Sequence, residues 1–350
     1  MKYSFYIGTY SVKGSQGIYH GELDTDRQTL KIKESYPEHS TNPSFLAVSG
    51  NRLYAVNELP SRGAVTTYER NEEHGGLKFL AQFETKGAGR CHVLVWPDKK
   101  HLSMANYKSG SLVVCALNEV GIPVQVTAFI QHEGVGHDLH GRQEAPHVHS
   151  TGFSADADFL YAADLGLDQL FCYHIEKDGS LRLADKKRQV KVPAGEGPRH
   201  FTFTQDGKYL YLVTEMGNRL HVLRQDTESG GYIELQSLST LPKGAKEGNA
   251  AADIHFSRDM RYLYVSNRGE DCIAGYSLDE KTGEAVCIGY FPVFGSWPRN
   301  FCITPDDRYV LAANQYSDNV VLCPRDPGTG VIGEKLCELS IPQPVFVEVV

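Results

Sequence analysis

Hydrophobic and polar positions along the chain repeat at intervals of about fifty residues. Each repeat holds an aromatic or aliphatic pair, then three small or apolar residues, then a polar residue. The second members of the seven pairs are Tyr6, Tyr54, Ser103, Tyr161, Tyr211, Tyr264 and Leu311. Seven copies at this spacing are typical of a repeat architecture rather than of a string of unrelated domains.

The surroundings of each pair predict three further strands. An apolar residue stands before the pair, as Phe203 does before Tyr211, and a turn such as 204–208 separates the two. An alternating run follows the pair, as in 219–224, and a more variable run follows that one, as in 285–291. Alternation with a period of two between turn-forming residues favours β-strands, and no long helical period competes. Each repeat is therefore predicted to be a four-stranded antiparallel sheet.

The two ends of the chain are predicted to complete one sheet together. No strand precedes Phe5, so the first repeat begins at its second strand, while the run 345–349 is a first strand that no repeat follows. Pairing these two pieces would close a ring and hide two sheet edges. We therefore expect an all-β fold: a seven-bladed β-propeller with four antiparallel strands per blade, forming a single domain over residues 1–350 and closed by the N- and C-terminal strands.

Composition and charge argue against several classes of function. The 350 residues are 41% hydrophobic with 34 Gly and 19 Tyr, as a globular, turn-rich β protein requires. A formal charge of −8 without a Lys/Arg run argues against nucleic-acid binding. No apolar stretch is long enough for a membrane span, and the first residues lack the apolar core of a signal peptide. With eight scattered Cys and no C-x-x-C pair, we expect a cytoplasmic protein with reduced thiols.

Polar residues recur at two positions of the repeat that a propeller places at one mouth of its channel. Those positions are the start of the first strand and the end of the second strand. They hold His149, Arg199, Arg299, Glu58, Glu215, Arg268 and Gln315, with Tyr10 and Tyr107 at equivalent places. Three arginines favour an anionic small molecule, because a guanidinium matches a carboxylate or phosphate. The alternative is that the arginines pair with Glu58 and Glu215 and brace the strands.

The segment 134–149 is rich in histidine and lies in the longest interval between repeats. Long loops between regular elements are more often functional than accidental. The segment supplies Arg142 and Glu144, and its end places His147 and His149 at the start of a first strand. A metal site is the alternative, with His137, His140, Glu144, His147 and His149 as ligands. Their spacing matches no recognised zinc pattern, so we expect neither a metal nor another cofactor.

Several motifs carry a family resemblance. They are Gly8-Thr-Tyr10, Asn42-Pro-Ser-Phe-Leu46, Leu53-Tyr-Ala-Val-Asn-Glu58, Arg142-Gln-Glu-Ala-Pro-His-Val-His149, Gly197-Pro-Arg-His200 and Ser266-Asn-Arg-Gly269. In order and spacing they resemble the seven-bladed β-propeller lactonases. That family includes the propeller-type 6-phosphogluconolactonases and is similar to the fungal carboxymuconate lactonising enzyme. The resemblance runs from Tyr3 to the last strand and departs at 248–253, where small residues replace a charged one.

The resemblance implies a metal-free enzyme that hydrolyses a sugar lactone, foremost 6-phosphogluconolactone, in the oxidative pentose phosphate route. The family's site residues fall on His147, His149, Arg199, Glu215 and Arg268. Lactone hydrolysis needs a base, charge stabilisation for the oxyanion and an anchor for the substrate. We expect His149 or His147 to be the base, Glu215 to orient it or to act itself, and Arg199 to stabilise the oxyanion. The substrate-binding residues would be Arg268, Arg299, Glu58, Arg142, Glu144 and Gln315.

Two other functions remain open from the sequence. A lactonising isomerase would need carboxylate clamps but no phosphate site, so a panel of substrates separates it from a lactonase. A non-catalytic propeller would bind a protein and could dispense with its channel residues. The absence of a Gly-x-Ser-x-Gly motif argues against a serine nucleophile. We expect a monomer or weak homo-oligomer whose partner is a small, anionic, phosphorylated sugar lactone.

Overall fold

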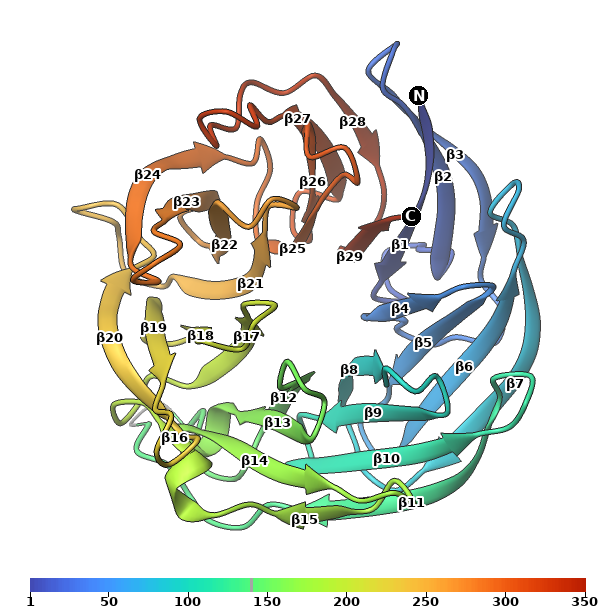
Figure 1. Cartoon of the computed structure of the whole chain (residues 1–350). Helices are drawn as coiled ribbons and strands as arrows, with labels where there is room; N and C mark the ends of the chain where they lie inside the picture. Colours follow the sequence, from blue (N-terminus) through green and yellow to red (C-terminus); the bar gives the residue numbers. More distant parts are fainter. Residues whose placement is uncertain (139–140) are drawn as a thin grey trace. The chain divides into compact units, whose positions relative to one another are not determined.

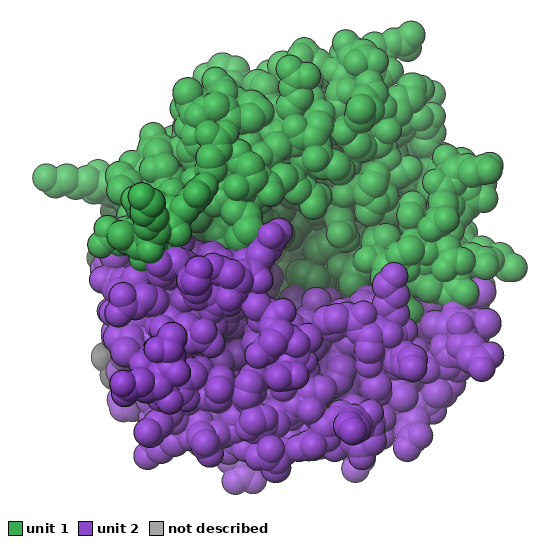
Figure 2. Space-filling view, in the orientation of Figure 1, with its two compact units in different colours: residues 1–55, 68–79, 240–350 green, residues 56–67, 80–239 purple. Residues whose placement is uncertain are grey.

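The described residues form seven β-sheets; six are built from strands that follow one another in sequence, and one joins the last strand to the first three (Figure 1). The computed structural model describes residues 1–138 and 141–350. They divide into two compact units, coloured in Figure 2. Unit 1 comprises residues 1–55, 68–79 and 240–350, and unit 2 comprises residues 56–67 and 80–239. That the whole chain is one domain stays a prediction.

Three complete sheets belong to unit 1. In spatial order, the first sheet consists of β29 (Pro344–Val349), β1 (Lys2–Thr9), β2 (Ile18–Asp24) and β3 (Thr29–Tyr36). The second consists of β21 (Ala250–Phe256), β22 (Tyr262–Arg268), β23 (Cys272–Leu278) and β24 (Ala285–Pro292). The third consists of β25 (Pro298–Ile303), β26 (Tyr309–Asn314), β27 (Asn319–Pro324) and β28 (Cys337–Ser340). The last strand, β29, runs antiparallel to β1, with Ile7 opposite Val347. The predicted joining of the two ends in one sheet is confirmed, and Figure 1 shows β29 beside β1.

Three further sheets belong to unit 2. The first consists of β8 (Arg90–Val95), β9 (His101–Asn106), β10 (Ser111–Leu117) and β11 (Pro123–Gln131). The second consists of β12 (Val148–Phe153), β13 (Phe159–Asp164), β14 (Gln169–Ile175) and β15 (Leu181–Leu183), and a short fifth strand, β16 (Val190–Lys191), also pairs with β14. The third consists of β17 (Pro198–Phe203), β18 (Tyr209–Thr214), β19 (Arg219–Gln225) and β20 (Tyr232–Ser239). The seventh sheet has residues in both units and consists of β4 (Leu46–Ser49), β5 (Arg52–Glu58), β6 (Gly63–Arg70) and β7 (Leu77–Thr85).

Helix is nearly absent from the described residues. They contain two three-residue 3-10 turns, η1 (Leu165–Leu167) and η2 (Lys186–Arg188). Neither is long enough to reach across a lipid bilayer. Seven antiparallel sheets, six of four strands and one with the short fifth strand β16, with almost no helix in the described residues, are the seven-bladed β-propeller that the repeat predicted.

The turn between the first and second strands is stabilised by the same side-chain hydrogen bonds in more than one sheet. In the turn after β25, the Thr304 hydroxyl donates to Asp306 Oδ1 (2.6 Å) and accepts from the Tyr309 amide (3.1 Å). The turn after β17 repeats this arrangement with Thr204 and Asp206. Short polar side chains that bond to nearby backbone favour turns over regular structure. The hairpin connections predicted at 204–208 and 304–308 are therefore confirmed and have a physical cause.

Candidate functional site

Five first strands carry a β-bulge at the position that the repeat register picked out. The pairing skips one residue in four strands, namely Cys91 in β8, His149 in β12, Arg199 in β17 and Arg299 in β25, and skips 252–253 in β21. A bulge leaves a residue outside the ladder of hydrogen bonds and redirects its side chain. At three of the five bulges the residue outside the ladder is one of the predicted site residues, His149, Arg199 or Arg299.

The histidine-rich segment between β11 and β12 is tied at both ends to one carboxylate. Asp164, fully buried at the end of β13, pairs with His132 Nδ1 through Oδ2 (2.6 Å) and accepts from the His147 amide through Oδ1 (2.7 Å). Within the segment, the side-chain Nε2 of Gln143 donates to the Leu165 carbonyl and to Asp168 Oδ1, at 2.7 Å each. His132 thus acts as a structural anchor, and the segment holds Arg142 and His147 in place.

Glu215 lies between two arginines. Its Oε2 is 2.9 Å from Arg199 Nε, and its Oε1 is 2.6 Å from Arg142 Nη2. Glu215 and Arg199 are nearly inaccessible to water, at 3% and 2% exposure, whereas Arg142 is partly exposed. Burial by itself lowers the pKa of Arg142, but the Glu215 carboxylate outweighs burial and raises it. The bracing alternative therefore describes the Arg199–Glu215 contact correctly, and Glu215 holds two guanidinium groups, one at each carboxylate oxygen.

Tyr107 joins this cluster to the histidines of the Pro-His-Val-His motif. Its ring is stacked on His147 (4.4 Å between centroids, 10° between planes) and meets His149 at 79° (5.6 Å). Its hydroxyl accepts from Arg142 Nη2 at 3.2 Å. Burial raises the pKa of Tyr107, although Arg142 opposes the change. Five of the predicted or equivalent residues, Tyr107, Arg142, His147, Arg199 and Glu215, are thus linked by direct contacts within unit 2.

Two further histidines extend the cluster. The His149 ring lies 5.2 Å from that of His200, and the His200 ring lies 5.8 Å from that of His92, both in edge-to-face arrangements. His92 directly follows the bulge residue Cys91, and His200 directly follows the bulge residue Arg199. Cys91 itself is buried, and its Sγ lies 3.3 Å from the His149 carbonyl. The three histidine rings therefore continue the cluster as a row of imidazole rings.

The remaining predicted arginines lie in unit 1. Arg268, at the end of β22, is 4% exposed and donates to the carbonyls of Ala250 (3.1 Å) and Ala251 (2.9 Å). Its guanidinium also lies over the ring of Trp297, at 5.6 Å. Arg299 lies over the ring of Tyr10 at the same distance. Both guanidinium groups thus lie against an aromatic face, which attracts a cation.

The other predicted site residues are Gln315, Glu58 and Glu144. Gln315 follows β26 in unit 1 and donates to Gln343 Oε1 at 3.2 Å. Glu58 ends β5 in unit 2 and is partly exposed. Glu144 is largely exposed, with its carboxylate 3.6 Å from His147 Nε2.

The metal alternative finds no support in the geometry of residues 1–138 and 141–350. No three His, Cys, Asp or Glu side chains there are arranged to hold an ion. His137 is exposed, and His140, its proposed co-ligand, lies outside the described residues.

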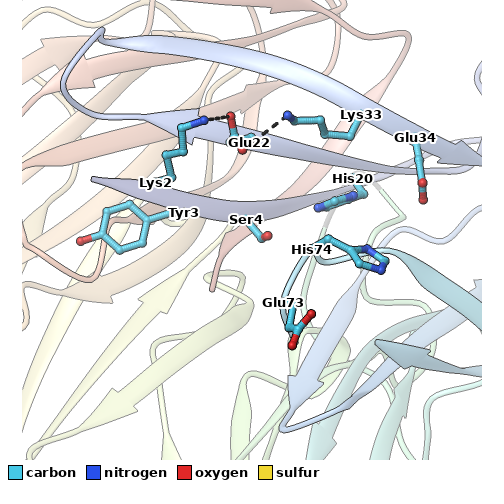
Figure 3. Close-up of a pocket in the computed structure, with 9 residues that line it drawn as sticks. All are labelled: Lys2, Tyr3, Ser4, His20, Glu22, Lys33, Glu34, Glu73 and His74. Carbon is cyan, nitrogen blue, oxygen red and sulfur yellow. Dashed lines mark hydrogen bonds and ion pairs between the residues drawn. The ribbon is translucent and has the colours of Figure 1, made fainter. Parts of the chain in front are cut away.

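A cavity of about 450 Å³ lies in unit 1, and its lining includes none of the predicted site residues (Figure 3). Its lining residues are Lys2, Tyr3, Ser4, His20, Glu22, Lys33, Glu34, Glu73 and His74. Glu22 bridges Lys2 at 3.0 Å and Lys33 at 3.4 Å, as the dashed lines in Figure 3 show. Burial lowers the pKa of His20 in its wall. With its lysines paired and no arginine in its wall, this cavity does not offer the anion-binding chemistry of the cluster around Glu215.

Sequence reasoning gave no role to Tyr107, His92 and His200. Tyr107 did appear in the repeat register, at the end of a second strand. The signal was therefore present, but a tyrosine carries no charge pattern that would mark it. His92 and His200 could have been found as the residues that directly follow two bulge positions.

The seven sheets and the cluster around Glu215 in unit 2 define a class of protein, the seven-bladed β-propeller lactonases. Residues 4–349 match the family model described as "Lactonase, 7-bladed beta-propeller", and the chain belongs to this family. More particularly, it is 34% identical to the 6-phosphogluconolactonase of Bacillus subtilis, over 99% of this chain and 98% of that one. It is 33% identical to the 6-phosphogluconolactonase of Formosa agariphila over 96% of each chain. Among solved structures, the periplasmic gluconolactonase of Pseudomonas aeruginosa superimposes with a TM-score of 0.92 at 29% identity, covering 100% and 99% of the two chains.

Proposed function

We propose that this lactonase opens the ester ring of a phosphorylated sugar lactone, with 6-phosphogluconolactone as substrate and 6-phosphogluconate as product. The observation that carries the proposal is the buried Glu215 carboxylate between Arg199 and Arg142, next to the stacked Tyr107–His147 pair. Family membership and the names of the two bacterial relatives support the same reaction.

The reaction requires one proton to be taken up and returned. A water molecule gives a proton to the base as its oxygen attacks the carbonyl carbon, and a tetrahedral oxyanion forms. The bond between that carbon and the ring oxygen then breaks, and the ring oxygen takes the proton from the base and leaves as a hydroxyl group. The new carboxylic acid releases one proton to solvent. An imidazole in hydrogen-bonding reach is suited to both transfers, and such a positioned base is worth on the order of 10²–10⁴ in rate.

We assign the base to the Pro-His-Val-His pair, His147 and His149, and oxyanion stabilisation to Arg199. A donor to an oxyanion is effective when it is held in place before the reaction, because no reorganisation is then needed. The Glu215 contact holds Arg199 in this way. Glu215 orients the charged groups, and Arg142, Glu144, Glu58 and Gln315 contribute to substrate binding.

We assign phosphate binding to Arg268 and Arg299. Both guanidinium groups lie against aromatic rings, and a guanidinium matches a phosphate with two parallel hydrogen bonds. We further propose that the protein works in the cytoplasm as a monomer or weak homo-oligomer. The eight cysteines, all free thiols, support a reducing compartment.

The test is a lactone-hydrolysis assay on two substrates, gluconolactone with and without the 6-phosphate, after subtraction of spontaneous hydrolysis. Hydrogen bonds to charged groups contribute about 1.5–3 kcal/mol each. We therefore expect kcat/KM to be about 10- to 100-fold higher for the phosphorylated lactone. The variant Glu215→Gln should lose most of the activity, whereas Glu228→Gln, an exposed carboxylate of the same unit, should retain it. Equal kcat/KM values would refute the phosphate assignment, and no enzymatic rate on either lactone would refute the proposed reaction.

A further inference from the structure

The backbone carbonyl of Tyr107 determines which nitrogen of His147 carries the proton. His147 Nδ1 lies 2.8 Å from that carbonyl oxygen. A carbonyl can only accept a hydrogen bond, so Nδ1 must be the donor, and in the neutral ring Nε2 keeps its lone pair. The carbonyl is itself positioned, because the Tyr107 amide donates to the Gly89 carbonyl at 2.8 Å. His147 Nε2 is therefore the ring atom able to accept a proton.

The Tyr107 ring fixes the plane of the same imidazole. The two rings are stacked nearly parallel at 4.4 Å, and His147 is 7% exposed. The stacked face therefore holds the imidazole in one plane. The Glu144 carboxylate lies 3.6 Å from Nε2 and is largely exposed to water.

The Tyr107 hydroxyl connects this imidazole to the arginine cluster. It accepts from Arg142 Nη2, and the same nitrogen donates to Glu215 Oε1. One residue thus contacts His147 through its carbonyl and its ring, and Arg142 through its hydroxyl.

We propose that Tyr107 is a positioning residue that holds His147 in the Nδ1–H tautomer and in a fixed plane, which makes His147 Nε2, rather than His149 or Glu215, the proton acceptor of the reaction. This inference rests on the proposed lactonase function for its catalytic half. Its structural half, the tautomer and orientation of His147, can be measured without any turnover.

The kinetic test compares two substitutions of Tyr107. Tyr107→Leu keeps the carbonyl but removes the aromatic face, and should lower kcat by about 3- to 30-fold with KM changed less than about twofold. Tyr107→Phe keeps both the carbonyl and the face, and should restore kcat to within about threefold of the parent. His147→Asn preserves a donor near the Nδ1 position but offers no base, so it should remain folded and lose activity. A fully active His147→Asn, or a Tyr107→Phe as impaired as Tyr107→Leu, would overturn the proposal.

The structural test is nitrogen NMR of histidine-labelled protein, with the His147 signals assigned by their loss in His147→Asn. In the neutral form we expect a protonated Nδ1 and an unprotonated Nε2, and the same tautomer in Tyr107→Leu, because that variant keeps the backbone carbonyl that accepts from Nδ1. If the Nδ1–H tautomer is seen but no lactone is hydrolysed, the positioning role stands and the proposed function fails. If neutral His147 carries its proton on Nε2, the positioning role fails whatever the activity.

Discussion

Glu348, near the end of β29, offers a stability test that can be worked out from the structure. Burial raises its pKa to about 7, against 4.5 for an ordinary glutamate, although His255, Arg258 and Arg70 oppose the change. A group whose pKa is raised on folding binds its proton more tightly in the folded state. Stability is therefore greatest below about pH 4.5, and it falls as pH rises through the folded pKa near 7.

The size of the effect follows from the shift. One pKa unit corresponds to about 1.36 kcal/mol. Because Glu348 is only partly buried, part of that energy is lost to solvent screening, and we expect about 1–3 kcal/mol. Glu348→Gln removes the titration but keeps the shape of the side chain. With the entropy of unfolding scaled to a chain of this length, it should raise Tm by about 1–4 °C at pH 8.5 and leave Tm unchanged or lower at pH 4.5.

The assay is thermal unfolding of parent and variant at both pH values, followed by circular dichroism. Glu334→Gln, an exposed carboxylate in the same unit, is the matched control and should show no gain at either pH. An equal gain at both pH values, or none at pH 8.5, would show that the Glu348 carboxyl is not the desolvated acid described above.

Four further outcomes are expected. Deleting residues 344–350 should lower Tm strongly, because the buried side chains of β29 contribute about 6–12 kcal/mol; an unchanged melting curve would contradict the closure of the first sheet. The two ring nitrogens of His221 lie 2.6 Å from the carboxylates of Glu196 and Glu234, and these carboxylates raise its pKa although burial alone would lower it. The stability that His221 contributes should therefore be complete below pH 6.5 and disappear at higher pH. The stability of His221→Gln should lack that pH dependence. Arg199→Ala should chiefly lower kcat, by about 10²–10³, and Arg268→Ala should chiefly raise KM; the reverse pattern would exchange their roles. Exhaustive chelation should leave activity intact, and a loss restored by one divalent ion would reinstate a metal.

The repeat could be predicted from sequence because every sheet uses the same pattern of buried positions. Tyr161, Tyr211 and Tyr264 are each about 1% exposed or less, so each repeat shows the same apolar signal at the same place. The joining of β29 with β1 followed from counting strands. These features depend on periodicity, which the sequence contains directly.

The site was only partly predictable. Register counting found His149, Arg199 and Arg299, but the bulges that redirect them depend on how neighbouring strands pair. The pairing of Arg268 with the carbonyls of Ala250 and Ala251 could not be foreseen either, because backbone acceptors leave no mark in a sequence. Tyr107 was missed because its role depends on three contacts, two to His147 and one to Arg142. Both residues belong to the segment 134–149, and the sequence does not show where that segment runs.

The pairing of β29 with β1 also has a consequence for the time at which the first sheet can form. Ile7 and Val347 are opposite one another but lie about 340 residues apart in the chain. At about 5–20 residues per second, a ribosome needs on the order of 20–70 s to make the chain between them. For that time the edge of β1 that later pairs with β29 has no partner from its own sheet, and an open strand edge is a template for pairing with another chain. Nascent chains stalled before residue 344 should therefore need a chaperone at β1, whereas chains released after residue 350 should not.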